Sequence, residues 1–149
     1  MSLKEQLAAD LKDAMKNRQT VRKNTVQMVR AAILQYEKDN KAELDDAGVT
    51  DIVAKELKRR RDVLPDYEKS GRDDLIAELR EEMQVLLSYL PEQLSEDELN
   101  SIVSAAIAQT GAATIKDMGK VMGLVVGQTK GRADAKLVGE LVKKALNQN

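Results

Sequence analysis

Apolar residues recur at helical spacing along almost the whole chain, and an alternation with a period of two residues never persists. The stripe formed by Leu75, Leu79, Met83, Leu86 and Leu90 is a clear example. Residues three or four positions apart share one face of an α-helix, so such a stripe needs other helices to cover it. The pattern therefore predicts an all-α fold.

Capping residues, glycines and prolines predict where these helices begin and end. Seven helices are expected, beginning after Ser2, near Thr20, at Thr50 or Asp51, near Arg72, after Ser95, after Thr114 and after Asp134. Pro65 is expected to kink or end the third helix, because its ring clashes with the carbonyl four residues earlier and its nitrogen carries no hydrogen. The segment from Asp39 to Thr50 is expected to be a loop, and the fourth helix is expected to reach Leu90.

Pro91 marks a change of organisation. It directly follows the fourth apolar stripe, and Ser95 with Glu98 forms a capping box that starts a new helix. A chain of 149 residues is long enough for two small domains. The sequence therefore predicts an N-terminal four-helix domain over residues 1–91 and a three-helix domain over residues 92–149.

The composition excludes many kinds of active site. The chain has no Cys and no His, so it cannot build a zinc finger, an iron–sulfur centre, a Ser-His-Asp triad or a Cys-His pair. It also lacks a P-loop, a Gly-x-Gly-x-x-Gly element and a Gly-x-Ser-x-Gly elbow. We expect no catalytic residue, no metal and no cofactor, so an enzyme acting alone is disfavoured.

The overall charge argues against nucleic acid coating the entire chain. There are 24 basic and 25 acidic residues, which gives a formal net charge of −1. From Gly111 onward, however, seven basic residues stand against three acidic ones, so a local basic patch is expected there. No apolar segment of a secretory signal follows Met1, and no window approaches the roughly 20 apolar residues of a membrane span. We therefore expect a cytoplasmic protein without a membrane segment.

Two groups of polar or small residues interrupt the apolar pattern. Glu56 and Arg60 fall inside the apolar arc of the third helix, so a partly buried ion pair or a solvated helix edge is expected. In the sixth helix Gly119, Gly123 and Gly127 recur at four-residue spacing, on the side opposite its apolar residues. Each interior glycine costs about 1 kcal/mol relative to Ala. Something is therefore expected to approach this bare backbone closely.

Two kinds of neighbour fit such a glycine face. Small residues allow a second helix to pack tightly, whereas bordering basic residues suit a sugar–phosphate backbone. The candidate nucleic-acid-binding residues are Lys116, Lys120, Lys130, Arg132, Lys136 and Lys143. The residues alone leave both alternatives open.

Two segments resemble a known family. Residues 89–95, which read YLPEQLS, resemble the interdomain signature of the YqeY proteins. Residues 117–123 read DMGKVMG and residues 130–134 read KGRAD. Both resemble the C-terminal module shared by YqeY and the tail of GatB, the B subunit of the tRNA-dependent Asp/Glu amidotransferase. The resemblance covers essentially the full length.

The resemblance implies an all-helical, two-domain protein whose C-terminal part is similar to the GatB tail. That tail is thought to hold the body of tRNA, and the catalytic, ATP-using part of GatB has no counterpart in this chain. The expectation is a non-catalytic protein that interacts with tRNA or associates with a tRNA amidotransferase. Its expected partners are tRNA and an aminoacyl-tRNA or amidotransferase component. One alternative is a protein–protein adaptor that docks a partner helix on the glycine face. A second alternative is a carbon–nitrogen ligase with glutamine as amide donor, a label inherited from the family.

Overall fold

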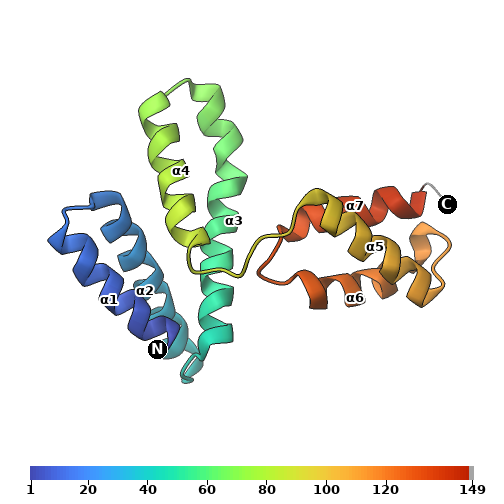
Figure 1. Cartoon of the computed structure of the whole chain (residues 1–149), viewed down its shortest axis with the longest axis horizontal. Coiled ribbons are helices and arrows are strands. Elements are labelled where there is room, and N and C mark those ends of the chain that lie inside the picture. The colour runs from blue at the N-terminus through green and yellow to red at the C-terminus, as the bar shows by residue number, and fades with distance from the viewer. Residues whose placement is uncertain (148–149) are drawn as a thin grey trace. The chain divides into compact units, whose positions relative to one another are not determined.

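The computed structural model describes residues 1–147 of the chain, and its regular elements over that range are all helical (Figure 1). The elements are α1 (Leu3–Lys16), α2 (Thr20–Asn40), α3 (Asp46–Ser70), α4 (Asp73–Leu87), α5 (Glu96–Thr110), the 3-10 helix η1 (Ile115–Asp117), α6 (Met118–Thr129) and α7 (Ala135–Asn147). No strand occurs in this described part of the chain. The all-α fold predicted from the apolar spacing is confirmed.

The chain divides into two compact units, one from Met1 to Leu90 and the other from Pro91 onward. In the first unit α1 pairs with α2 and α3 pairs with α4 (Figure 1). The fully buried side chains at the centre of this unit are Leu7, Val26, Val29, Val49, Val53, Leu57 and Leu86. That residues 1–91 and 92–149 fold as independent domains stays a prediction.

The second unit packs α5, α6 and α7 around a core of its own. The fully buried side chains of this core are Leu99, Val103, Val121, Val125, Val142 and Leu146. The segment before α5 is held to the turn between α6 and α7. The Leu94 N–H donates to the Arg132 carbonyl at 2.9 Å, and the Gln93 side chain donates to the Gly131 carbonyl at 2.9 Å. Residues 93 and 94 are therefore fixed to this unit.

Several helix ends form as the sequence predicted. Ser2 and Glu5 make a reciprocal capping box at α1, and Ser95 accepts from the Glu98 N–H at 3.1 Å at α5. Gly71 and Gly111 follow α3 and α5 with φ of 69° and 70°. Glycine takes this left-handed conformation at little cost, so both positions end their helices.

The prediction for Pro65 is wrong, because α3 continues through it to Ser70. Pro65 is exposed, so water can reach the carbonyl of Arg61 that loses its backbone partner. Packing of α3 along α4 holds the helix on both sides of this position.

Two helix boundaries were also predicted wrongly. Helix α3 begins at Asp46, where the side chain of Asp45 accepts from the Gly48 N–H at 2.9 Å, so most of the expected 39–50 loop is helical. Helix α4 ends at Leu87, three residues before the expected Leu90. In the first case a capping aspartate outweighs a local sequence that looks like a loop.

The Glu56–Arg60 pair is buried, with each residue 7% exposed. Arg60 Nη1 lies 3.1 Å from Glu56 Oε2, and Arg60 Nε lies 3.4 Å from Glu82 Oε2 of α4. Arg60 Nη2 also donates to the sulfur of Met28 in α2 at 3.6 Å. The expected ion pair is therefore confirmed, and it links three helices.

Candidate nucleic-acid interface

Gly119, Gly123 and Gly127 form an exposed strip along α6, called here the glycine strip. A methyl group placed on any of the three would have no atom within 4 Å beyond the adjoining backbone. Within the described part of the second unit, no other helix packs against this strip. The cost of three interior glycines is thus not offset by internal packing in that part of the chain.

The glycine strip faces away from the core of its unit. On the opposite side of α6, Val121 and Val125 are fully buried. At 100° per residue the strip is bordered by Lys120 on one side and by Val126 on the other. Lys120 is exposed and Val126 is 42% exposed. The strip therefore has one cationic edge and one apolar edge.

Lys116 and Lys130 lie at the two ends of the strip but outside α6. Lys116 belongs to the 3-10 helix η1, and Lys130 is the C-cap residue with φ −56° and ψ 125°. Both residues are exposed. The sequence predicted one continuous α-helix that begins after Thr114. The structure corrects this prediction, because a 3-10 helix precedes α6 and Lys130 lies at its C-cap.

Asp117 anchors the start of the strip. Its carboxylate accepts from the Ala113 N–H at 3.0 Å and from the Thr114 N–H at 3.4 Å. These two bonds, with a smaller contribution from Lys120, lower the pKa of Asp117 below its usual value. The carboxylate is thus committed to the capping box that Thr114 forms with it.

Arg132 has a structural role that sequence reasoning missed. It is half-buried, and its Nε donates to the Glu92 carbonyl at 3.3 Å. Its own carbonyl accepts the bond from Leu94, so Arg132 ties the start of the unit to the turn after α6. No spacing rule could pair residues 40 positions apart.

Lys136 and Lys143 share an exposed face of α7, and the exposed Glu140 lies on the same face. Their face is opposite Val138 and Val142, which are buried in the core. Because α6 and α7 turn their apolar sides to one core, their outer faces point in different directions. The structure therefore brings Lys120 together with the strip, with Lys116 and Lys130 at its ends, and places Lys136 and Lys143 elsewhere.

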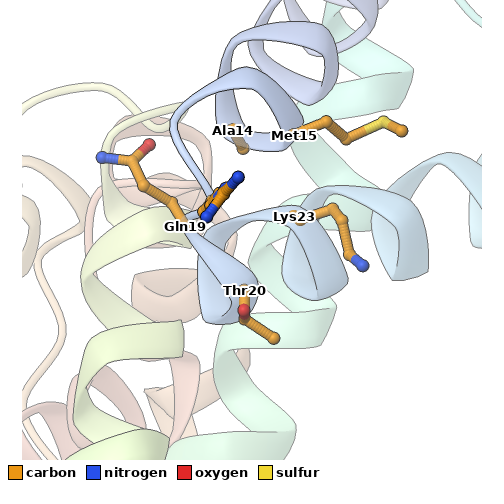
Figure 2. Close-up of a pocket in the computed structure, with 6 residues that line it drawn as sticks. Ala14, Met15, Gln19, Thr20 and Lys23 are labelled. Carbon is orange, nitrogen blue, oxygen red and sulfur yellow. The ribbon is translucent and has the colours of Figure 1, made fainter.

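The first unit has a hollow of about 270 Å³ at the turn between α1 and α2. It is lined by Ala14, Met15, Arg18, Gln19, Thr20 and Lys23. Figure 2 shows the side chains of Met15 and Lys23 extending to one side and that of Gln19 to the other. These polar groups do not converge on a point, so we assign no site there.

The described residues hold no group of three or more acidic side chains arranged to bind a metal. None of the helices over residues 1–147 combines the length and the apolarity needed to cross a bilayer.

The fold and the open strip define a class of helical protein built from a four-helix unit and a three-helix unit. The chain belongs to the YqeY family: the family pattern, described as Yqey-like protein, matches residues 4–146. The resemblance of the two sequence segments to the YqeY family is thereby confirmed.

Relatives named "Altered inheritance of mitochondria protein 41, mitochondrial" are similar to this chain. The protein from Pyrenophora tritici-repentis is 27% identical over 143 residues, covering 94% of this chain and 78% of the relative. The one from Meyerozyma guilliermondii is 32% identical over 128 residues, covering 82% and 67%. The one from Eremothecium gossypii is 34% identical over 85 residues, covering 56% and 46%. In this last case the match spans less than half of the relative.

The names of these relatives, which place them in mitochondria, contradict the cytoplasmic location predicted from the sequence. That prediction rested on the missing apolar segment, which argues only against a secretory signal and a membrane span. Mitochondrial targeting segments are amphipathic and rich in Arg, so this observation had no bearing on them. The cytoplasmic prediction is therefore wrong.

Proposed function

We propose that this chain is a non-catalytic RNA-binding protein that holds the sugar–phosphate backbone of a tRNA against the glycine strip. The observation that carries the proposal is the open backbone of Gly119, Gly123 and Gly127, over which no other element of the described second unit lies. Lys120 borders this backbone and Lys116 lies at one end, both exposed. A phosphate chain can approach a bare helix backbone closely and pair with such side chains.

The proposed contact is with the backbone of the RNA and not with its bases. Single-stranded bases are usually held by stacking on aromatic side chains. The chain has only three aromatic residues, Tyr36, Tyr67 and Tyr89, and all three precede Pro91. The second unit therefore lacks stacking groups, and its binding would depend on charge and shape.

The choice of tRNA among RNAs rests on the resemblance of residues 117–134 to the tail of GatB. The same resemblance supports association with an amidotransferase component. In that setting this chain would hold the RNA, and the ligase chemistry would belong to the partner. The chain's own contribution needs neither a nucleophile nor a metal.

A partner helix docked on the strip is the second candidate function. It is favoured by the apolar edge at Val126, because small and apolar residues together allow close helix packing. The two candidates differ in how strongly they depend on salt.

The test is an anisotropy titration of labelled tRNA with the full chain, with Lys120→Glu and with Lys12→Glu, each at two salt concentrations. Lys12 is an exposed lysine of α1 and is the matched control for the charge reversal. We expect Lys120→Glu to weaken binding several-fold and to reduce the log–log salt slope by about 0.7–0.9 for each phosphate group that the variant no longer neutralises. Lys12→Glu should bind like the wild type.

Equal, salt-independent binding by all three proteins would contradict the RNA proposal and favour the docked helix. Equal binding that still falls with salt would place the RNA on another surface. Circular dichroism and melting temperature should be unchanged in both variants, because both side chains point to solvent.

A further inference from the structure

At the turn between α3 and α4, the other helices of the first unit leave part of an apolar surface exposed. On α3, Glu56, Arg60, Val63 and Tyr67 follow one another at spacings of four, three and four residues. These residues lie on one face of the helix. On α4, Leu75, Leu79, Glu82 and Leu86 repeat the same spacing.

The two stripes belong to the same face of the pair. The contact of Arg60 Nε with Glu82 Oε2 at 3.4 Å joins them, and the bond from Arg60 to Met28 shows that α2 lies over this face. The face is covered at the end of the pair farther from the turn between α3 and α4, since Glu56 is 7% exposed and Leu86 is fully buried.

Beyond Arg60 the cover is incomplete: Leu79 of α4 is still buried, at 5% exposed, but the apolar side chains around it are not. Val63 is 39% exposed, Tyr67 36% and Leu75 38%, and Met28 on the facing side of α2 is 49% exposed. Figure 1 shows α1 and α2 diverging from α3 and α4 toward the turn between the latter two. These four side chains are called the hairpin face.

The charges beside the hairpin face are unbalanced. Asp66 follows Val63 by three residues and Glu78 follows Leu75 by three, so both carboxylates border the face. Both are exposed, and neither has an ion-pair or hydrogen-bond partner among the described residues. Among the nearby cations Arg59 and Arg60 both pair with Glu56, whereas Lys69, three residues after Asp66, is exposed and forms no ion pair among the described residues.

We propose that the hairpin face docks an amphipathic helix of a partner protein whose apolar stripe is flanked by Lys or Arg. Apolar anchors spaced at three and four residues are the usual form of helix-in-groove recognition. A cationic flank would complement Asp66 and Glu78. RNA is disfavoured because these carboxylates repel phosphates. A symmetric dimer through this face is disfavoured because it would bring like carboxylates together.

The test uses two designed, labelled helical peptides as probes. Both carry the same leucine stripe, one flanked by Lys and the other by Glu, and each is titrated with the full chain by anisotropy. The variants are Tyr67→Ser and Glu78→Lys. The control is Asp73→Lys, which reverses a charge on the opposite side of α4. Circular dichroism checks that each variant is folded. If Tyr67→Ser unfolds, Glu78→Lys still tests the proposal, because Glu78 is exposed and its replacement should not affect folding.

We expect saturable binding of the Lys-flanked peptide, at least about tenfold tighter than that of the Glu-flanked one. Glu78→Lys and Tyr67→Ser should each weaken it about tenfold or more, while Asp73→Lys leaves it unchanged. Equal binding of both peptides, or binding that neither variant changes, would overturn the proposal. So would self-association in sedimentation experiments that Tyr67→Ser abolishes, because the occupant would then be a second copy of this chain.

Discussion

The hydroxyl group of Tyr89 joins the C-terminal end of the first unit to α1. Tyr89 is 8% exposed, and its hydroxyl donates to the carboxylate of Asp10 in α1. The same carboxylate lies 3.4 Å from Arg22 of α2. Burial, followed by the bond to Asp10, raises the pKa of Tyr89 well above its ordinary value near 10. The folded state therefore favours the neutral hydroxyl.

This shift predicts a loss of stability in alkaline solution. Because the folded-state pKa is raised, the stabilisation is fully present below pH about 10 and is lost as the pH rises through the higher folded value. The melting temperature of the wild type should fall more steeply above pH about 10 than that of Tyr89→Phe, which has no proton to lose. Thermal melts followed by circular dichroism from pH 7 to 11.5 measure this difference. Parallel curves for the two proteins would contradict the role given to the hydroxyl.

At the scale of elements, α3 shows how packing overrides a local signal. Pro65 lies inside the helix, where it removes one backbone hydrogen bond and restricts the preceding turn. The helix continues because contacts with α4 outweigh this local cost.

Replacing Pro65 with Ala should therefore stabilise the protein. Restoring the N–H to the Arg61 carbonyl should raise the free energy of unfolding by about 1–3 kcal/mol. Urea unfolding followed by circular dichroism provides the measurement. Asp66→Ala, at the neighbouring exposed position, is the control and should change stability much less. A lower stability of Pro65→Ala would mean that the proline ring makes a contact that its exposure does not indicate.

The elements themselves were largely predictable from the sequence. Apolar spacing located the helices, and Ser2, Ser95 and Gly111 marked ends that the structure confirms. The start of α3 at Asp46 was missed because Asp45 to Gly48 is typical of a loop when tertiary contacts are ignored.

Only the part of the candidate site that lies on a single helix could be predicted from the sequence. The spacing of Gly119, Gly123 and Gly127 was sufficient to place the strip opposite the core. The bond from Arg132 to Glu92 joins distant segments, so a local pattern could not indicate it. The same limit applies to the hairpin face: periodicity identified an apolar stripe at Leu75 but not which part of it remains uncovered.

At the scale of the molecule, the linker between the two units is short. Tyr89 is bonded to Asp10 of the first unit, and residues 92–94 are bonded to the turn after α6, so residues 90–91 form the linker between these anchors. A second connection, residues 41–45, joins α2 to α3.

Limited proteolysis should therefore cut first at residues 90–91 or within residues 41–45. Proteases need an extended, accessible backbone, which helices packed on a core do not offer. Mass spectrometry of early subtilisin fragments identifies the sites, and a fragment starting near residue 91 should resist further digestion. Early cuts inside α4 or α6 would contradict the division into two units.

The charge of the second unit also limits how it can bind RNA. From Pro91 onward seven basic residues are balanced by seven acidic ones, four of which lie between Glu92 and Glu98. Attraction by the unit as a whole is therefore weak, and contact must be local to the glycine strip.

The most direct test of contact at the glycine strip is the affinity of Gly123→Leu for tRNA, titrated beside the wild type at low salt. A Cβ added at Gly123 would meet no atom within 4 Å, so a leucine there should raise the stability of α6 by about 0.5–1 kcal/mol. The same side chain would stand where the RNA backbone is proposed to lie. We predict at least tenfold weaker binding together with an unchanged or higher melting temperature. Binding of Gly123→Leu that equals the wild type would contradict the account.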